Sequence, residues 1–171
     1  MAISQSFIKA AKGSVRESIE LASTKIRADS NNIKSAFLSH SHKDSELAAA
    51  LQDFLWKQGW RIYIDWQDGT MPDNPNKETA EKIQRRIKDN NWFIFLATNN
   101  SVSSRWCPWE LGYADEVRGK SQIVIIPTSD SAGNYGNEYF ELYRRIDIDK
   151  ENKIREFSPG FYYTSNSLSG L

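Results

Sequence analysis

Short apolar runs alternate with amphipathic stretches along the chain from about residue 34 onward. Four of these runs are dominated by apolar residues, namely 36–39, 61–65, 92–97 and 123–126. Several have apolar residues at successive positions, which is typical of strands covered on both faces in a parallel sheet. A weaker run at 145–149 follows a loop rich in Ser, Gly and Asn. The pattern therefore predicts five strands in one parallel sheet.

Helical periodicity fills the segments between these runs. Apolar residues recur at spacings of three and four over 47–55, 80–87 and 111–117. Gly59 and Gly119 follow the first and third of these stretches, as is common at helix C-termini. Strands and helices that alternate at this pace predict a doubly wound α/β fold, in which ligands bind at the carboxyl ends of the strands.

The first 32 residues follow a different pattern. One apolar stripe with helical spacing is formed by Ile8, Ala11, Val15, Ile19, Ala22 and Ile26. We assign residues 1–32 to an N-terminal helical extension and residues 33–171 to the main domain. The stripe either docks on this domain or pairs with another copy or a partner, because its spacing also fits a coiled-coil seam.

Composition narrows the class of protein. The chain has 171 residues, the size of one domain, with 22 basic and 22 acidic side chains. This balance gives no overall electrostatic field that would attract nucleic acid or anionic membranes. No apolar run approaches the roughly 20 residues that span a bilayer. The N-terminus has no apolar signal-peptide core, and the single Cys107 excludes an intramolecular disulfide. We expect a cytoplasmic protein.

The loop after the first strand run contains both histidines of the chain, His40 and His42. Ser41 and Asp44 have the spacing of a capping box, so they either only cap the next helix or help to hold a phosphate there. The histidine pair has no evident third metal ligand except Asp44 or Asp65, and we predict no metal site. The chain has neither a G-x-G-x-x-G motif nor a Walker lysine, so Rossmann-type redox chemistry and P-loop NTP hydrolysis are not supported.

A long turn-rich loop, 65–76, follows the second strand run. Loops of this length in compact domains are usually functional or mobile. Asp65 stands at the strand tip, where it either orients a ligand hydroxyl or caps its own turn.

The stretch 99–112 after the third strand run is the most informative. Pro108 fits the first turn of a helix, and Trp106 and Glu110 lie four residues apart on the same side. Glu110 shares the apolar side that faces the sheet. If Pro108 is the first helical residue, Glu110 is placed to cap its own helix. The alternative is a catalytic carboxylate.

Three motifs together resemble the Toll/interleukin-1 receptor (TIR) domain family. They are F-L-S-H-x-x-K-D at 37–44, Y-I-D-W at 63–66 and S-x-W-C-x-x-E-L at 104–111. The resemblance covers about residues 34–150 and omits the leading helix and the tail over 157–171. It implies a flavodoxin-like α/β fold, with a five-stranded parallel sheet and helices on both faces.

A stand-alone domain of this size resembles the prokaryotic members of the family. Many of these cleave NAD, and those of Thoeris-type antiphage systems convert NAD to a signal, often a cyclic ADP-ribose isomer. The resemblance implies that Glu110 is the catalytic carboxylate and that the nucleotide site is lined by Ser39, His40, Ser41, Asp65, Trp66 and Trp106. It also implies NAD as substrate rather than cofactor, association through TIR–TIR contacts, and a separate effector that senses the product.

One departure from the family concerns the loop after the first strand run. Some NAD-cleaving relatives have Arg where this chain has Ser41, His42 and Lys43. Phosphate contacts in this loop would then fall to His, Lys and backbone N–H groups.

A single carboxylate suits this chemistry because the nicotinamide of NAD is already positively charged and leaves as a neutral base. No general acid is needed, unlike in ordinary glycoside hydrolysis. Trp66 and Trp106 either stack on the flat rings or pack in the core.

Three other functions stay open from the residues. A noncatalytic adaptor would use the loop over 68–76 as its docking surface. A deoxyribosyltransferase-like enzyme would also break an N-glycosidic bond with a Glu. A thiol protease would pair Cys107 with one of the histidines, although nothing supplies an orienting third group.

Overall fold

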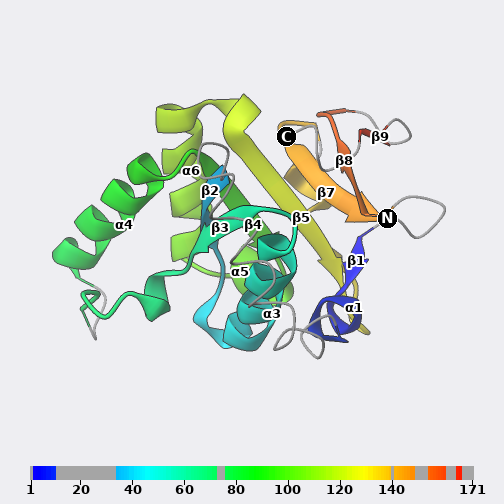
Figure 1. Ribbon diagram of the computed structural model, residues 1–171, viewed down its shortest axis with the longest axis horizontal. Helices are drawn as coiled ribbons and strands as arrows, with labels where there is room; N and C mark the ends of the chain where they lie inside the picture. Colours follow the sequence, from blue (N-terminus) through cyan, green and yellow to red (C-terminus); the bar gives the residue numbers. More distant parts are fainter. Residues whose placement is uncertain are drawn as a thin grey trace.

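The computed structural model describes residues 2–10, 34–72, 76–139, 141–148, 154–160 and 165–166. Its centre is the expected parallel sheet, with strand order β3-β2-β4-β5-β7 (Figure 1). The strands are β2 (Lys34–Ser39), β3 (Trp60–Tyr63), β4 (Trp92–Ala97), β5 (Ile123–Ser129) and β7 (Arg144–Ile148). All four pairings among them are parallel, so the predicted five-stranded sheet is confirmed. β3 ends at Tyr63, two residues before the predicted end, because Asp65 begins a 3-10 turn.

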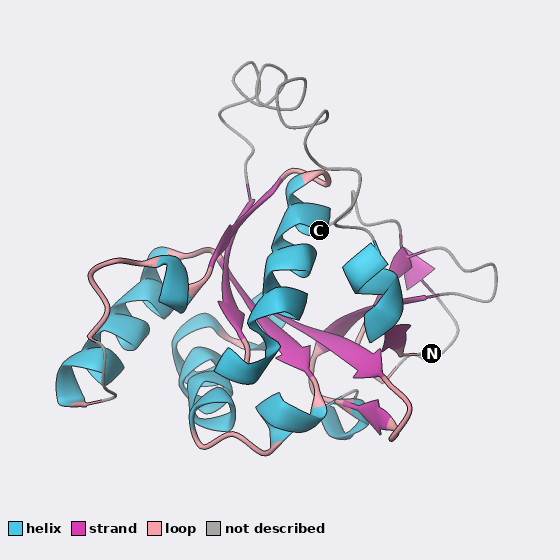
Figure 2. Ribbon diagram, turned by 90° about the horizontal axis from the view of Figure 1, so that it is seen from below, coloured by secondary structure: helices cyan, strands magenta, loops and turns pink. Residues whose placement is uncertain are grey.

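Helices cover both faces of the sheet (Figure 2). They are α3 (Ser45–Trp56), α4 (Lys77–Asp89), the short α5 (Asn99–Val102) and α6 (Trp106–Arg118). Leu38 and Leu96 pack in one core cluster with α3, whereas Phe37 and Phe95 pack in a second cluster with α4 and α6. Successive residues of a strand point to opposite faces of the sheet, and both faces are covered by helices. Residues at successive positions must therefore be apolar, which accounts for the continuous apolar runs.

Short strands extend the sheet beyond its parallel centre. β8 (Ile154–Phe157) pairs antiparallel with β7, and β9 (Ser165–Asn166) pairs antiparallel with β8. β6 (Asn134–Tyr135) pairs antiparallel with β5. Part of the tail that the family motifs leave out therefore belongs to the same sheet.

The N-terminus begins with a strand rather than with the expected helix. β1 (Ile3–Ser4) pairs parallel with the end of β5, and α1 (Gln5–Ala10) follows. The rest of the predicted apolar stripe lies in residues 11–33, outside the described residues, so the domain boundary at residue 32 stays a prediction. Within the described part, Ile3 and Ile8 are buried in the core cluster on the α3 face.

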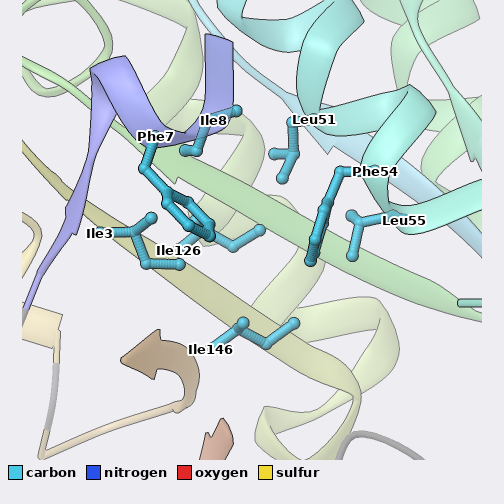
Figure 3. Close-up of a pocket in the computed structure, with 8 residues that line it drawn as sticks. All are labelled: Ile3, Phe7, Ile8, Leu51, Phe54, Leu55, Ile126 and Ile146. Carbon is cyan, nitrogen blue, oxygen red and sulfur yellow. The ribbon is translucent and has the colours of Figure 1, made fainter. Parts of the chain in front are cut away.

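A small apolar cavity of about 10 Å³ lies where α1 meets α3. Figure 3 shows its lining, which includes Phe7 and Ile8 from α1 and Phe54 from α3. A cavity of this volume has room for about one water molecule, so it is a packing gap and not a ligand site. None of the described helices is both long and apolar enough to cross a membrane.

Candidate active site

Glu110 lies on the stripe of α6 that faces the sheet. The buried residues of α6 are Cys107, Glu110, Leu111 and Ala114, which share one side of the helix at spacings of three and four. Glu110 is only 5% exposed. The sequence pattern predicts this carboxylate on the apolar side of its helix, and the structure confirms that position.

Ser39, the last residue of β2, donates a hydrogen bond from its Oγ to Glu110 Oε2 at 2.6 Å. Ser39 is two positions from Phe37, and so it points to the face that α6 covers. The two hydrogen-bonded residues are 71 positions apart in sequence. The fold therefore joins two candidate site residues from separate motifs.

The start of α6 rules out the interpretation of Glu110 as a simple helix cap. The helix begins at Trp106, two residues before Pro108, so Glu110 lies beyond the position that caps a helix. Ser104 fills that role, because its Oγ accepts hydrogen bonds from the backbone N–H groups of Trp106 and Cys107. The Glu110 carboxylate is therefore not used as a cap, and it accepts its hydrogen bond from Ser39 instead.

Burial raises the pKa of Glu110 to about 8, and the nearby negative charge of Asp65 acts in the same direction. The hydrogen bond from Ser39 acts in the opposite direction, because it stabilises the ionised form. A strongly raised carboxyl pKa at the strand ends of an α/β sheet is typical of functional sites.

His40 and Asp65 face each other across the ends of β2 and β3. His40 Nδ1 lies 3.1 Å from the carbonyl oxygen of Leu38, so this nitrogen donates and carries the proton. His40 Nε2 lies 3.9 Å from Asp65 Oδ1, and the exposed His42 places its Nε2 3.7 Å from Asp65 Oδ2. Burial lowers the pKa of His40, which favours the neutral ring.

Asp65 also caps its own turn, since its Oδ1 accepts a hydrogen bond from the Trp66 N–H at 2.9 Å. The cap interpretation therefore holds. Orientation of a ligand hydroxyl by the same carboxylate stays a prediction.

A cleft of about 460 Å³ opens beside Asp65. Its lining consists of His42, Asp65, Trp66, Asp68, Gly69, Met71, Pro72 and Thr79. Trp66 is 43% exposed at this cleft, so its ring is available for stacking. Residues 73–75 of the long loop lie outside the described residues.

Asp68 anchors the described part of this loop to α4. Its carboxylate accepts hydrogen bonds from Arg86 at 2.7 Å and from the Tyr63 hydroxyl at 2.8 Å. These bonds, together with those from Thr70, hold the pKa of Asp68 well below its ordinary value. The motifs gave no sign of this anchor, because Asp68 and Arg86 belong to different elements with no shared pattern.

The capping box predicted for Ser41 and Asp44 is wrong in its geometry. Ser41 caps only the 3-10 turn His42–Asp44, by accepting a 3.4 Å hydrogen bond from the Lys43 N–H. The Asp44 carboxylate instead accepts hydrogen bonds from Thr98 at 2.5 Å and from Asn100 at 2.7 Å. Both of these residues lie directly after β4. This long-range pairing ties two strand ends together, and sequence spacing did not reveal it.

Two other candidate side chains are placed by packing. Trp106 is half-buried against the core on the α6 face, with its ring edge-on to Trp109 at 5.4 Å between centroids. Cys107 is buried, and burial raises the pKa of its thiol to about 12. A protonated, buried thiol is a poor nucleophile, which argues against the protease alternative.

The sequence comparisons agree with this fold and site. A family model described as "TIR domain" matches residues 36–157, which is more than half of the chain. The chain belongs to the TIR domain family.

Two curated relatives are similar to this chain. One, named "Probable 3' cyclic ADP-D-ribose synthase ThsB'", from Bacillus cereus (strain MSX-D12), is 35% identical over 118 residues. The other, named "Putative cyclic ADP-D-ribose synthase TIR2", from Cytobacillus dafuensis, is 28% identical over 124 residues. The matches cover 67% and 68% of this chain, but only 61% and 32% of the relatives' own lengths.

Proposed function

We propose that this protein cleaves the nicotinamide–ribose bond of NAD and releases nicotinamide and a cyclic ADP-ribose-type signal in antiphage defence. The observation that carries the proposal is the Glu110 carboxyl, buried on the sheet-facing side of α6 and held by Ser39 at the strand ends of a TIR fold. The names of the two relatives, both cyclic ADP-ribose synthases, support the same reaction class.

Glu110 provides the negative charge that stabilises the transition state of this reaction. As the bond to the cationic nicotinamide breaks, electrons move to the leaving base and positive charge develops on the ribose. A carboxylate close to the ribose stabilises that charge, and it accepts hydrogen bonds from the ribose hydroxyls. One carboxylate is enough because the leaving group needs no proton.

The raised pKa of Glu110 fits this role. Before substrate binds, the carboxyl holds a proton at neutral pH, because burial and Asp65 oppose ionisation. A bound cationic nicotinamide ring favours the ionised form, since an opposite charge lowers a carboxyl pKa. Substrate binding thus favours release of the Glu110 proton to solvent, which leaves the negative charge that the transition state uses.

Burial of Glu110 also bears on the fate of the ribosyl cation. Water gives linear ADP-ribose, whereas attack by the substrate's own adenine or ribose closes a ring. A site with a 5% exposed carboxyl restricts water, which favours ring closure.

The partners follow from the same proposal. We propose that copies associate through TIR–TIR contacts and that a separate effector senses the product. We place the reaction in the cytoplasm, where the free thiol of Cys107 stays reduced.

Incubation of the purified protein with NAD, followed by chromatography and mass spectrometry, tests the proposal. We expect nicotinamide and a nucleotide with the mass of ADP-ribose less one water. Intact NAD at high protein concentration, with association promoted by a crowding agent, would count against the reaction. The noncatalytic adaptor would gain support if Glu110→Gln also kept full antiphage activity.

A further inference from the structure

His40 carries a buried ring nitrogen with no hydrogen-bond partner within the described part of the chain. This atom is Nε2, and the His40 side chain is 2% exposed. The proton of the neutral ring sits on Nδ1, which donates to the Leu38 carbonyl. Nε2 is therefore a bare acceptor, and a buried acceptor without a donor costs free energy of folding.

The group that faces this nitrogen is also an acceptor. Asp65 Oδ1 lies 3.9 Å away, too far for a direct hydrogen bond, and a carboxylate has no proton to donate. Asp65 Oδ1 already accepts from the Trp66 N–H but has a further lone pair, so two acceptors face each other across a gap. A donor with two hydrogens, placed between the two atoms, would satisfy both.

The chemistry of such a donor is restricted. A ribose hydroxyl has one hydrogen and serves only one of the two acceptors. A primary amide or an aryl amine has two hydrogens on one nitrogen and serves both. NAD has one of each, the carboxamide of nicotinamide and the 6-amino group of adenine.

The position of Asp65 gives a route for this group. Asp65 lines the 460 Å³ cleft, and its side chain keeps 15% exposure, whereas His40 is not among the residues that line the cleft. An amino group that enters from the cleft would meet the Asp65 carboxylate first, and this carboxylate would have to turn for the group to reach His40.

We propose that His40 Nε2 and Asp65 Oδ1 together form a site that accepts the two N–H bonds of one –NH₂ group of the dinucleotide. This inference rests on the proposed function for the identity of the ligand. It assigns His40 and Asp65 to recognition, separate from the role of Glu110 in bond cleavage.

Two NAD analogues distinguish the two sources of the amino group. In 3-acetylpyridine adenine dinucleotide a methyl group replaces the carboxamide –NH₂, and in nicotinamide hypoxanthine dinucleotide an oxo group replaces the adenine –NH₂. We expect kcat/KM of the wild type to fall on the order of 10- to 100-fold for one analogue, because buried acceptors would be left unpaired.

The variant His40→Phe shows whether the discrimination comes from this site. Phe keeps a ring of similar size but has no acceptor. The discrimination, measured as kcat/KM for NAD divided by kcat/KM for the rejected analogue, should therefore fall in this variant. We expect it to come within about threefold of the ratio of the intrinsic reactivities of the two dinucleotides. Glu116→Gln, an exposed change on α6 away from this site, is the control and should keep the wild-type ratio. Asp65→Asn gives a second variant, should His40→Phe fail to fold.

The outcomes separate this inference from the proposed function. Equal kcat/KM for all three dinucleotides would overturn the amino-group site while NAD cleavage stands. A discrimination ratio that is unchanged in His40→Phe would do the same. A bridging water would then occupy the gap between His40 and Asp65. If NAD is not cleaved, calorimetric binding of the three dinucleotides to Glu110→Gln decides. Discrimination there upholds the amino-group site and contradicts only the reaction, whereas equal or absent binding overturns the site.

Discussion

Among the described residues, buried charged side chains gather in two regions, along β7 and β8 and at the carboxyl ends of β2 and β3, and their surroundings differ. At the β7–β8 edge, Arg144 pairs with the buried Glu156 at 2.7 Å, and Arg145 pairs with Asp147 at 3.4 Å. The Arg145 guanidinium also lies over the Phe157 ring, 4.4 Å from its centroid. Each buried acid here has a cation beside it.

At the carboxyl ends of β2 and β3 the arrangement is reversed. Glu110 is buried near a second carboxylate, Asp65, and its described hydrogen bond comes from the neutral Ser39. His40 contributes a neutral ring whose free nitrogen also faces Asp65. The acidic side chains of β7 and β8 are paired with cations, whereas those at the strand ends have no cation beside them among the described residues, which is the arrangement that our proposal of a cationic ligand requires.

The largest effect should come from Glu110→Gln. The amide oxygen can still accept from Ser39, so the fold should be kept while the negative charge is lost. We expect the initial rate of NAD cleavage to fall at least on the order of 10²- to 10³-fold. Glu116→Gln, a change on the same helix away from the buried stripe, is the control and should retain the wild-type rate. A Glu110→Gln rate within about tenfold of wild type would remove the catalytic role.

Loss of a cation at the other region should affect stability instead. Arg145→Met removes an ion-pair partner of Asp147, which is 1% exposed, together with the contact of the guanidinium with the Phe157 ring, and we expect the free energy of unfolding to fall by about 3 kcal/mol. Urea denaturation measures this change. Arg61→Met, an exposed change on β3, should shift it by less than about 0.5 kcal/mol. A loss below about 1 kcal/mol for Arg145→Met would mean that the two regions are not energetically different.

The buried acid at the strand ends should make the fold less stable as pH rises. Between the ordinary carboxyl pKa of 4.5 and the folded value of about 8, the folded state binds the Glu110 proton and the unfolded state does not. The free energy of unfolding therefore decreases through this window and levels off above it. Glu110→Gln has no such loss, so its stability relative to wild type should rise by on the order of a few kcal/mol between about pH 4 and pH 9. The raised pKa would be contradicted if the urea midpoints of wild type and Glu110→Gln changed by the same amount across this pH range.

The smallest effect should come from Ser39→Ala. Loss of the hydrogen bond removes an influence that favours the ionised carboxyl, so the pKa of Glu110 should rise further. At pH 7 we expect kcat/KM to fall by about tenfold, with recovery at higher pH as the carboxylate forms. Ser103→Ala, an exposed change before α6, should leave the pH profile in place. A Ser39→Ala profile that coincides with wild type would show that the 2.6 Å bond does not control ionisation.

The sequence by itself predicted the frame of this molecule. Runs such as 92–97 predicted strands buried on both faces, and the spacing over 111–117 predicted the sheet-facing side of α6. Periodicity carries this information because burial of a face is decided by residues close together in the chain. For the same reason, local spacing was enough to assign Glu110 to the buried side of its helix.

Contacts between strand ends required the tertiary structure. The bond between Ser39 and Glu110 spans 71 positions, the bond between Asp44 and Thr98 spans 54, and no local pattern encodes either. The start of α6 at Trp106 is a local feature by comparison, since Ser104 accepts a hydrogen bond from the Trp106 N–H two positions away. The sequence determined which side chains are buried and polar. Only the order of the parallel strands decided which of them meet, because that order brings distant segments to one edge of the sheet.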